Sequence, residues 1–361
     1  MTAENEIVVE LLEDARKFSE RHSTRDSLVR VLQVFKKNHS PKLWEIYEKT
    51  EEYLPSALGI VMAMEKGGFI EPENGFLKLT GKGKNLVDLV VPKAVDYRTM
   101  EDFRFGVKMP AELKRIEGEI RRISQELIMK DEFDQAPITA DSVVLKAYHM
   151  ISRGDIAGKS VVLLGDDDLM SIVLGLTSLP KEILVIDIDK DVAGIVEKYS
   201  KKLGIKVPMR AVVHDFRKPI PKNIRGKFDT FVTQPPDTVL GMLLFVSRGV
   251  ELLKDEPGMV GYAGFTKTGC PQLGILDFWE KIVGMKLVIS EVIPKFTVYP
   301  GIRTEIKEVE VPEFIDYPPK QFWYISDLIR LKTTKRSKSM FEGKTFEGDI
   351  SDYRRDVLKY R

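Results

Sequence analysis

Short apolar runs alternate with amphipathic helical patterns along the chain from about residue 134 onward. Such runs predict strands that are buried on both faces, as in a parallel sheet covered by helices. Strands are expected at Ser160–Gly165, Ile183–Asp189, Met209–Asp215, Asp229–Thr233, Met259–Phe265, Lys286–Val292 and Phe322–Lys332. Helices are expected between most of them, at 168–177, 190–203, 238–253 and 271–284. This order predicts an α/β domain over residues 134–335, with a Rossmann-like seven-stranded sheet of the methyltransferase type.

Residues 1–90 have a different pattern, which predicts a small winged helix-turn-helix domain. Its expected elements are helices at Asp26–Lys37, after Ser40 and at Leu54–Glu65, a hairpin at Glu73-Asn74-Gly75 and a further helix from about Thr80. Asn-Gly is a strong hairpin signal, and Ser40 followed by Pro41 is typical of a helix start.

The charge of this module argues against DNA binding. Segment 22–90 holds ten Lys and Arg against nine Asp and Glu, whereas DNA-binding modules neutralise many phosphates. The third helix offers few side chains that could contact a base edge, with Lys66 at its end. We therefore expect packing, dimerisation or covering of an active site, and we regard nucleic acid as an unlikely partner.

Two further segments are polar. Residues 91–133 are expected to form a charged linker with a helix near 111–129, whose many opposite-charge pairs suit a solvated or dimer-facing helix. Residues 336–361 are expected to form a polar, mobile C-terminal tail.

Composition narrows the class of protein. The chain has 361 residues and a formal net charge of +1, and its one cysteine, Cys270, excludes an intramolecular disulfide framework and a four-thiolate zinc site. No uncharged apolar run reaches the roughly 18 residues of a membrane span, and the acidic N-terminus lacks a signal-peptide layout. We therefore expect a soluble, cytoplasmic protein. Charged residues make up 31% of the chain, with only 11 Asn and Gln, which favours a thermophilic source.

Three adjacent acids follow the first strand of the predicted sheet. Gly165 precedes Asp166, Asp167 and Asp168 at a turn where nucleotide-binding proteins contact their ligand. Three carboxylates would repel a pyrophosphate and attract a cation or an amine. The alternatives are that Asp168 caps the next helix while the other two are solvated, or that the three acids bind a metal.

Acids also end the next two strands. Asp187 lies 22 residues after Gly165, where an acid accepts hydrogen bonds from a ribose, although it could instead cap a helix. Asp215 ends the third strand, at a position suited to contact an adenine amino group. We expect its neighbour His214 to be a packed loop residue.

The fourth strand ends in Thr233-Gln234-Pro235-Pro236-Asp237. Two prolines stiffen the loop, because each fixes its own φ and restricts the preceding residue. This element is typical of enzymes that act on nitrogen with an adenosyl sulfonium donor, and the alternative is a simple loop stop.

Together these motifs resemble the branched-chain polyamine synthases. The resemblance rests on EFDQA (132–136), LLGDDDL (163–169), VIDID (185–189), HDFRKP (214–219) and KFDTFVTQPPDT (227–238). It implies a winged-helix domain before a Rossmann-like catalytic domain, a homodimer, and transfer of an aminopropyl group from decarboxylated S-adenosylmethionine to a secondary amine of spermidine. No metal is implied.

The resemblance also implies roles for particular residues. Asp167 would hold and activate the amine, and Asp134 would help to hold the aminopropyl chain. The expected substrate-binding residues are Asp134, Asp166, Asp168, Gln234 and Asp237, and the expected donor-binding residues are Gly165, Asp187, Asp215 and Pro235.

Two departures put the identity of the amine in doubt. The family pattern after the fourth strand is Asp-Pro-Pro-Glu, where this chain has Gln234 and Asp237, and an acid is expected where this chain has Gly269. The alternatives are an S-adenosylmethionine-dependent amine methyltransferase and a non-catalytic winged-helix regulator.

Overall fold

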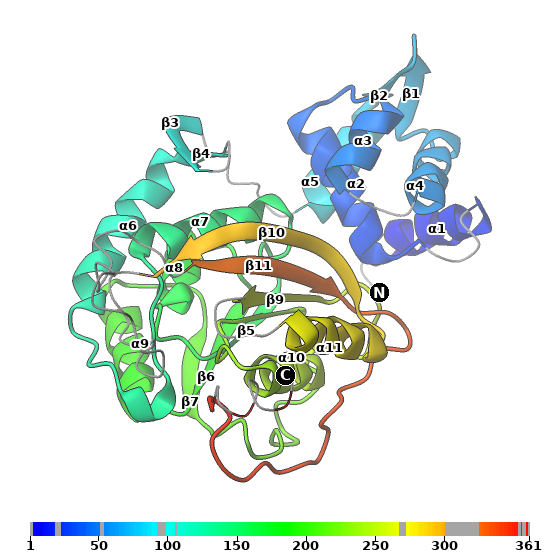
Figure 1. Cartoon of the computed structure of the whole chain (residues 1–361). Helices are drawn as coiled ribbons and strands as arrows, with labels where there is room; N and C mark the ends of the chain where they lie inside the picture. Colours follow the sequence, from blue (N-terminus) through cyan, green and yellow to red (C-terminus); the bar gives the residue numbers. More distant parts are fainter. Residues whose placement is uncertain are drawn as a thin grey trace. The chain divides into compact units, whose positions relative to one another are not determined.

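The computed structural model describes residues 3–18, 23–50, 54–91, 99–104, 107–266, 272–299 and 325–352, together with 355 and 359. The chain divides into two compact units, Met1–Asp96 and Tyr97–Arg361 (Figure 1). The expected acidic position at Gly269 and the cysteine at 270 lie outside the described residues.

The second unit is built on one mixed sheet of seven strands. Its strands are β5 (Ser160–Leu164), β6 (Glu182–Asp187), β7 (Met209–Val213), β8 (Thr230–Thr233), β9 (Val260–Phe265), β10 (Val288–Val298) and β11 (Ile325–Lys332). They are ordered β10-β11-β9-β8-β5-β6-β7. The five strands β5 to β9 are parallel, while β11 is antiparallel to β9 and β10 is antiparallel to β11. The predicted α/β fold with a seven-stranded sheet is confirmed.

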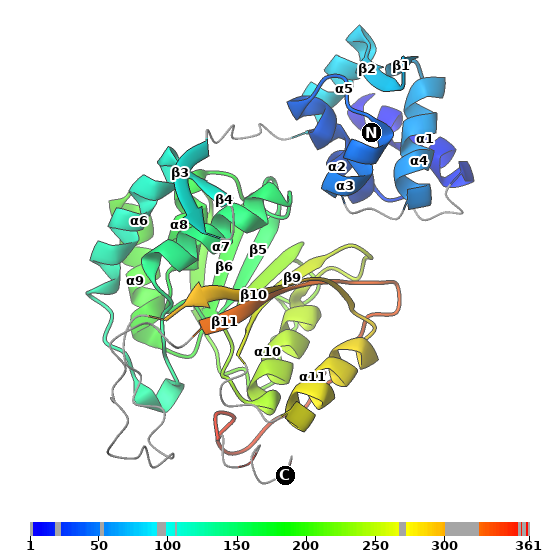
Figure 2. The same ribbon diagram turned by 45° about the horizontal axis from the view of Figure 1, so that its top comes forward.

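Helices cover both faces of this sheet (Figures 1 and 2). On one face lie α6 (Ala111–Ser124), α7 (Ala140–Ser152), α8 (Met170–Thr177) and α9 (Lys190–Lys202). On the other lie α10 (Val239–Leu252) and α11 (Gln272–Gly284). Each face forms a separate apolar core against the sheet, and burial of this apolar surface is the main force that holds the layers together.

Helix α6 is part of this domain, contrary to the predicted charged linker. The inner face of α6 is buried in the core against α7 and α8 through Leu113, Ile120 and Ile123. The charged pairs of α6 occupy its outer face. The charges conceal an apolar stripe in the sequence, which is why the helix was expected to be solvated. A two-stranded hairpin of β3 (Thr99–Arg104) and β4 (Val107–Pro110) precedes it and was not predicted.

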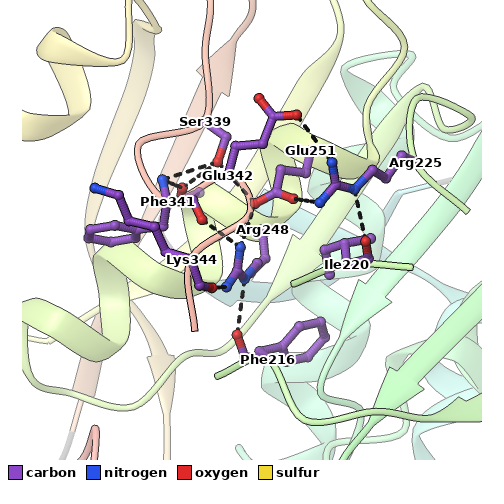
Figure 3. Close-up of polar contacts among 10 residues, drawn as sticks. Phe216, Ile220, Arg225, Arg248, Glu251, Ser339, Phe341, Glu342 and Lys344 are labelled. Atoms are coloured by element: carbon purple, nitrogen blue, oxygen red, sulfur yellow. Dashed lines mark hydrogen bonds and ion pairs between the residues drawn. The ribbon is translucent and has the colours of Figure 1, made fainter. Parts of the chain in front are cut away.

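The first part of the predicted mobile tail is packed against the domain. Figure 3 shows Arg248 of α10 holding this segment: its guanidinium donates to the carbonyl oxygens of Phe341 at 2.8 Å and Lys344 at 2.6 Å. The same group donates to the carbonyl of Phe216 at 3.0 Å and to Glu251 at 2.7 Å. Arg248 is fully buried, so the backbone of the segment satisfies a cation that water cannot reach.

The first unit contains α1 (Ala3–Phe18), α2 (Arg25–Lys37), α3 (Leu43–Thr50), α4 (Leu54–Lys66), a hairpin of β1 (Ile70–Glu73) and β2 (Phe76–Leu79), and α5 (Gly81–Val90). Asn74 and Gly75 have φ of 51° and 81°, as the predicted Asn-Gly turn requires. Helix α4 buries Ile60, Val61 and Met64 and packs mainly against α1.

Candidate active site

A cavity lies at the carboxyl ends of β5, β6, β7 and β8, where parallel sheets of this kind bind ligands. Its wall combines the loops after these strands with residues 132–136 and 349–351. Most of the predicted site residues meet here: Asp134, Gly165, Asp167, Asp187, Asp215, Gln234, Pro235 and Asp237. Asp166 and Asp168 are not among the described residues that line it.

Asp166 and Asp168 hold the first turn together through hydrogen bonds within it, and the expectation that they bind substrate stays a prediction. Asp166 is fully buried and accepts hydrogen bonds from the backbone N–H of Ser171 at 3.0 Å and from its hydroxyl. Asp168 is 7% exposed, and its Oδ1 accepts from the backbone N–H of Met170 at 3.2 Å. Burial raises the pKa of both carboxyls. Asp168 thus bonds the first residue of the next helix, Met170, although the N-cap of that helix is Leu169. The alternative in which the other two acids are solvated does not hold for Asp166, which is fully buried.

The turn itself separates the three acids. Gly165 has φ of 77° and Leu169 has φ of 61°, so the backbone reverses sharply on both sides of the trio. Asp167 faces the cavity, and its Oδ2 accepts from the backbone N–H of Ala136 at 2.9 Å. This bond joins the first turn to the EFDQA loop.

The EFDQA loop is fixed from a second direction. Lys130 Nζ lies 2.6 Å from Asp189 Oδ1, and Gln135 Nε2 donates to Asp189 Oδ2 at 2.9 Å. Asp134 has φ of 53°, a left-handed conformation that Asp tolerates better than most residues. Both sets of bonds hold the loop in place, and Asp134 and Asp167 both line the cavity.

Asp187 and Asp215, which end β6 and follow β7, also line the cavity. Asp187 accepts from the backbone N–H groups of Asp166 at 2.9 Å and Asp189 at 2.8 Å. Burial raises the pKa of Asp187 to about 6. Burial acts in the same direction on Asp215, but the hydrogen bonds and charge of Arg217 outweigh it and hold the pKa of Asp215 below its usual value.

Gln234 of the Pro-Pro loop has hydrogen-bond partners for all its polar hydrogens. Its Nε2 donates to Tyr299 Oη at 2.5 Å and Ser326 Oγ at 2.9 Å, and its Oε1 accepts from Lys146 Nζ at 3.1 Å. Gly264 of β9 makes room for this amide, because a Cβ there would lie 2.2 Å from Gln234 Nε2.

Sequence reasoning missed three contributions to the site. Lys146 lies in an apolar helical pattern that gives no sign of a site, and Tyr299 follows the antiparallel strand β10. The C-terminal segment adds Asp349, Ile350 and Ser351 to the wall. Thr238 donates to the carbonyl of Ile350, and Arg217 Nη1 donates to the carbonyl of Gly348 at 3.3 Å.

The cavity is strongly acidic. Its described lining includes the acids Glu132, Asp134, Asp167, Asp187, Asp215, Asp237 and Asp349. Arg217 is the one basic residue in that lining, and it is paired with Asp215 at 2.9 Å. An arrangement of this kind favours a ligand with several positive charges.

Two searches of the described residues bear on other classes of site. They contain no helix that is both long and apolar enough to cross a membrane. They also contain no cluster of three or more His, Cys, Asp or Glu arranged to hold a metal ion.

Comparison with known proteins finds that the chain is similar to one family. A sequence model of the branched-chain polyamine synthase A C-terminal domain matches residues 120–355. The chain is 35% identical over 329 residues to N(4)-bis(aminopropyl)spermidine synthase of Thermococcus kodakarensis, which covers 87% of this chain and 90% of that protein. The protein of the same name from Methanocaldococcus jannaschii is 31% identical over 317 residues, with 86% of this chain and 87% of that protein covered.

A solved structure agrees in fold. The branched-chain polyamine synthase from Thermus thermophilus, in complex with N4-aminopropylspermidine and 5'-methylthioadenosine, matches with a TM-score of 0.59 and 26% identity. The match covers 96% of this chain and 98% of that chain.

Proposed function

The chain belongs to the branched-chain polyamine synthase family, and we propose that it transfers an aminopropyl group to a secondary amine of spermidine or a similar polyamine. The observation that carries this proposal is the acidic cavity with Asp167 on its wall. A polyamine is a polycation, so it needs carboxylates at intervals along its length. The products are a branched polyamine and methylthioadenosine.

We propose that the donor is decarboxylated S-adenosylmethionine. This donor keeps a primary ammonium but has no carboxylate, so it suits an acidic wall better than S-adenosylmethionine does. Asp134 would bind the aminopropyl ammonium. On the other part of the wall, Asp187 would accept from the ribose and Asp215 would accept from the adenine amino group, while Gly165 and Pro235 shape the wall around the nucleoside.

The reaction is a displacement at carbon. The amine lone pair attacks the carbon next to the sulfonium sulfur, the carbon–sulfur bond breaks with its electrons going to sulfur, and the nitrogen loses a proton. Asp167 would align the nitrogen and accept that proton, and no oxyanion has to be stabilised. Its bond to the N–H of Ala136 fixes the carboxylate in place. Asp237 would bind another nitrogen of the acceptor.

We further propose that the first unit is a winged-helix domain and that two copies of the chain form a homodimer. The order of α2, α3 and α4, then the β1–β2 hairpin, then α5, which follows α1, supports the first proposal. The exposed side chains of α4 include Leu58 and Met62, which cannot hydrogen-bond a base edge, so a role in packing is more fitting than one in reading DNA bases.

Calorimetry tests the choice of donor. The intact protein is titrated with decarboxylated S-adenosylmethionine and, separately, with S-adenosylmethionine. We expect the decarboxylated donor to bind at least tenfold more tightly, which corresponds to about 1.4 kcal/mol. A preference for the intact donor would favour the alternative function, an amine methyltransferase.

A further inference from the structure

One lysine is buried directly behind the acidic wall. Lys146 of α7 is 0% exposed, and its Nζ lies 3.1 Å from Gln234 Oε1 and 3.4 Å from the carbonyl oxygen of Thr233. A buried ammonium needs hydrogen-bond acceptors in its surroundings. Here they come from the Pro-Pro loop, so Lys146 and this loop are placed together.

The contact with Lys146 fixes which way the Gln234 amide points. Lysine only donates hydrogen bonds, so the amide oxygen must face it. The amide nitrogen then faces Tyr299 and Ser326, to which it donates at 2.5 and 2.9 Å. Because Tyr299 accepts this bond, its own hydroxyl proton is directed elsewhere. The amide packs directly against the backbone of Gly264, where a Cβ would lie 2.2 Å from Gln234 Nε2.

The charged groups around this cluster come from several elements. Asp168, Asp166 and Asp167, all in the turn after β5, are the charges that act on Lys146, while burial lowers the pKa of Lys146. Asp237, after β8, and Asp167 are the charges that act on Tyr299. Lys146 therefore lies behind the inner part of the wall, where the reacting nitrogen and Asp167 would meet.

We propose that Lys146 is a positioning residue for the acceptor amine, which acts through Gln234 and through its own positive charge. This inference rests on the function proposed above. A fixed cation disfavours a second positive charge nearby, so the reacting nitrogen is held as the free amine while the other nitrogens of the polyamine stay charged against the outer acids. Gln234 is neutral and adds no charge of its own, so the local field is set by Lys146 and by the acids Asp166, Asp167 and Asp168.

The test compares three variants by the pH dependence of kcat for aminopropyl transfer to spermidine. Lys146→Met removes the charge and the bond to Gln234. We expect the acidic limb of the profile to move up by about one pH unit, and kcat at pH 7 to fall about tenfold, because the bound amine is more readily protonated. Affinity for methylthioadenosine, measured by calorimetry, should change less than about twofold, because Asp187 and Asp215 are untouched.

Gln234→Glu keeps Lys146 but neutralises its charge, and we expect a shift in the same direction. If Lys146→Met does not fold, the pH profile of Gln234→Glu tests the proposed role of Lys146 by itself. Ser326→Ala is the matched control, since it removes one hydrogen bond of Gln234 without a change of charge, and its acidic limb should stay at the wild-type pH.

An unchanged acidic limb in Lys146→Met and in Gln234→Glu would overturn the proposal, even if their melting temperatures fall. So would an equal shift in Ser326→Ala. Absence of aminopropyl transfer by the wild-type protein would instead overturn the proposed function, so the two failures can be told apart.

Discussion

Asp167 is the residue on which the proposed chemistry depends most. Asp167→Asn retains an oxygen that can accept from the N–H of Ala136 at the present 2.9 Å, so the fold should be preserved. The amide cannot take a proton from the amine, and we expect kcat to fall by about 10²–10⁴-fold. Steady-state assays with spermidine measure this, and near-normal turnover would contradict the assigned role.

Its neighbour provides the control. Asp166→Asn alters a buried acid that bonds Ser171 and does not line the cavity. We expect this change to lower the melting temperature while kcat per folded molecule stays within a few-fold of wild type.

We expect the proposed contact of Asp187 with the ribose to make nucleoside binding depend on pH. Burial raises the pKa of this carboxyl to about 6, and the protonated form is a poorer acceptor for ribose hydroxyls. The dissociation constant of methylthioadenosine should rise roughly tenfold between pH 7 and pH 5, as expected for protonation of one group. Asp215, whose pKa is held low by Arg217, should contribute nothing in this range. Titration calorimetry on wild type and Asp187→Asn checks this, and a pH-independent wild-type constant would contradict it.

At the level of single residues, the sequence predicted where the acids lie but not which way they point. Asp166, Asp167 and Asp168 are identical in type and adjacent, so nothing local distinguishes them. The left-handed φ at Gly165 and Leu169 decides that Asp167 faces the cavity. The left-handed conformation of Gly165 could be foreseen because glycine adopts it readily, whereas leucine, as at position 169, rarely does.

Strand β9 shows how an element shapes the site without contacting a substrate. Gly264→Ala would place a Cβ about 2.2 Å from Gln234 Nε2, so the amide must move away from Tyr299 and Ser326. We expect overpacking to lower the free energy of unfolding by about 1–3 kcal/mol. We also expect a lower kcat for aminopropyl transfer to spermidine. Thermal melts and steady-state assays measure both effects. Gly261→Ala on the same strand, which would meet Phe231 instead, is the control: it should destabilise without a specific effect on kcat.

The parallel strands were predicted to within a few residues because continuous apolar runs are a strong local signal. Strand β10 was expected at Lys286–Val292 but extends over Val288–Val298. Its last four residues alternate polar and apolar side chains, and the strand lies at the sheet edge with an irregular register against β11. No residue type in this stretch marks where the strand ends. Tyr299 follows this unpredicted part, which is why it was missed as a site residue.

At the scale of the whole molecule, the C-terminal segment completes the cavity and depends on Arg248 (Figure 3). Arg248→Met leaves buried carbonyls without their donor, and we expect a loss of about 3 kcal/mol or more. Limited proteolysis should cut residues 333–352 faster. Arg225→Met is the comparison: it loses the pairs of Arg225 with Glu342 and Glu251, both at 3.1 Å, but keeps the bonds from Arg248 to the backbone of the segment, so it should accelerate cleavage less. Equal proteolysis of wild type and Arg248→Met would contradict this role.

The net charge of +1 is an average that hides this arrangement. Acids gather on the cavity wall, while Lys146, which lies behind it, is buried. The motif spacing allowed the acids to be placed together, because parallel strands end at one edge of the sheet. Lys146 and residues 349–351 reach the site only through tertiary packing.

The most direct measurement of the central claim is mass spectrometry of the products. The purified chain is incubated with spermidine and decarboxylated S-adenosylmethionine, and in parallel with spermidine and S-adenosylmethionine. The account predicts an aminopropyl group on the secondary nitrogen of spermidine, with an equal amount of methylthioadenosine, from the first mixture only. A methylated amine from the second mixture, with no transfer in the first, would contradict it.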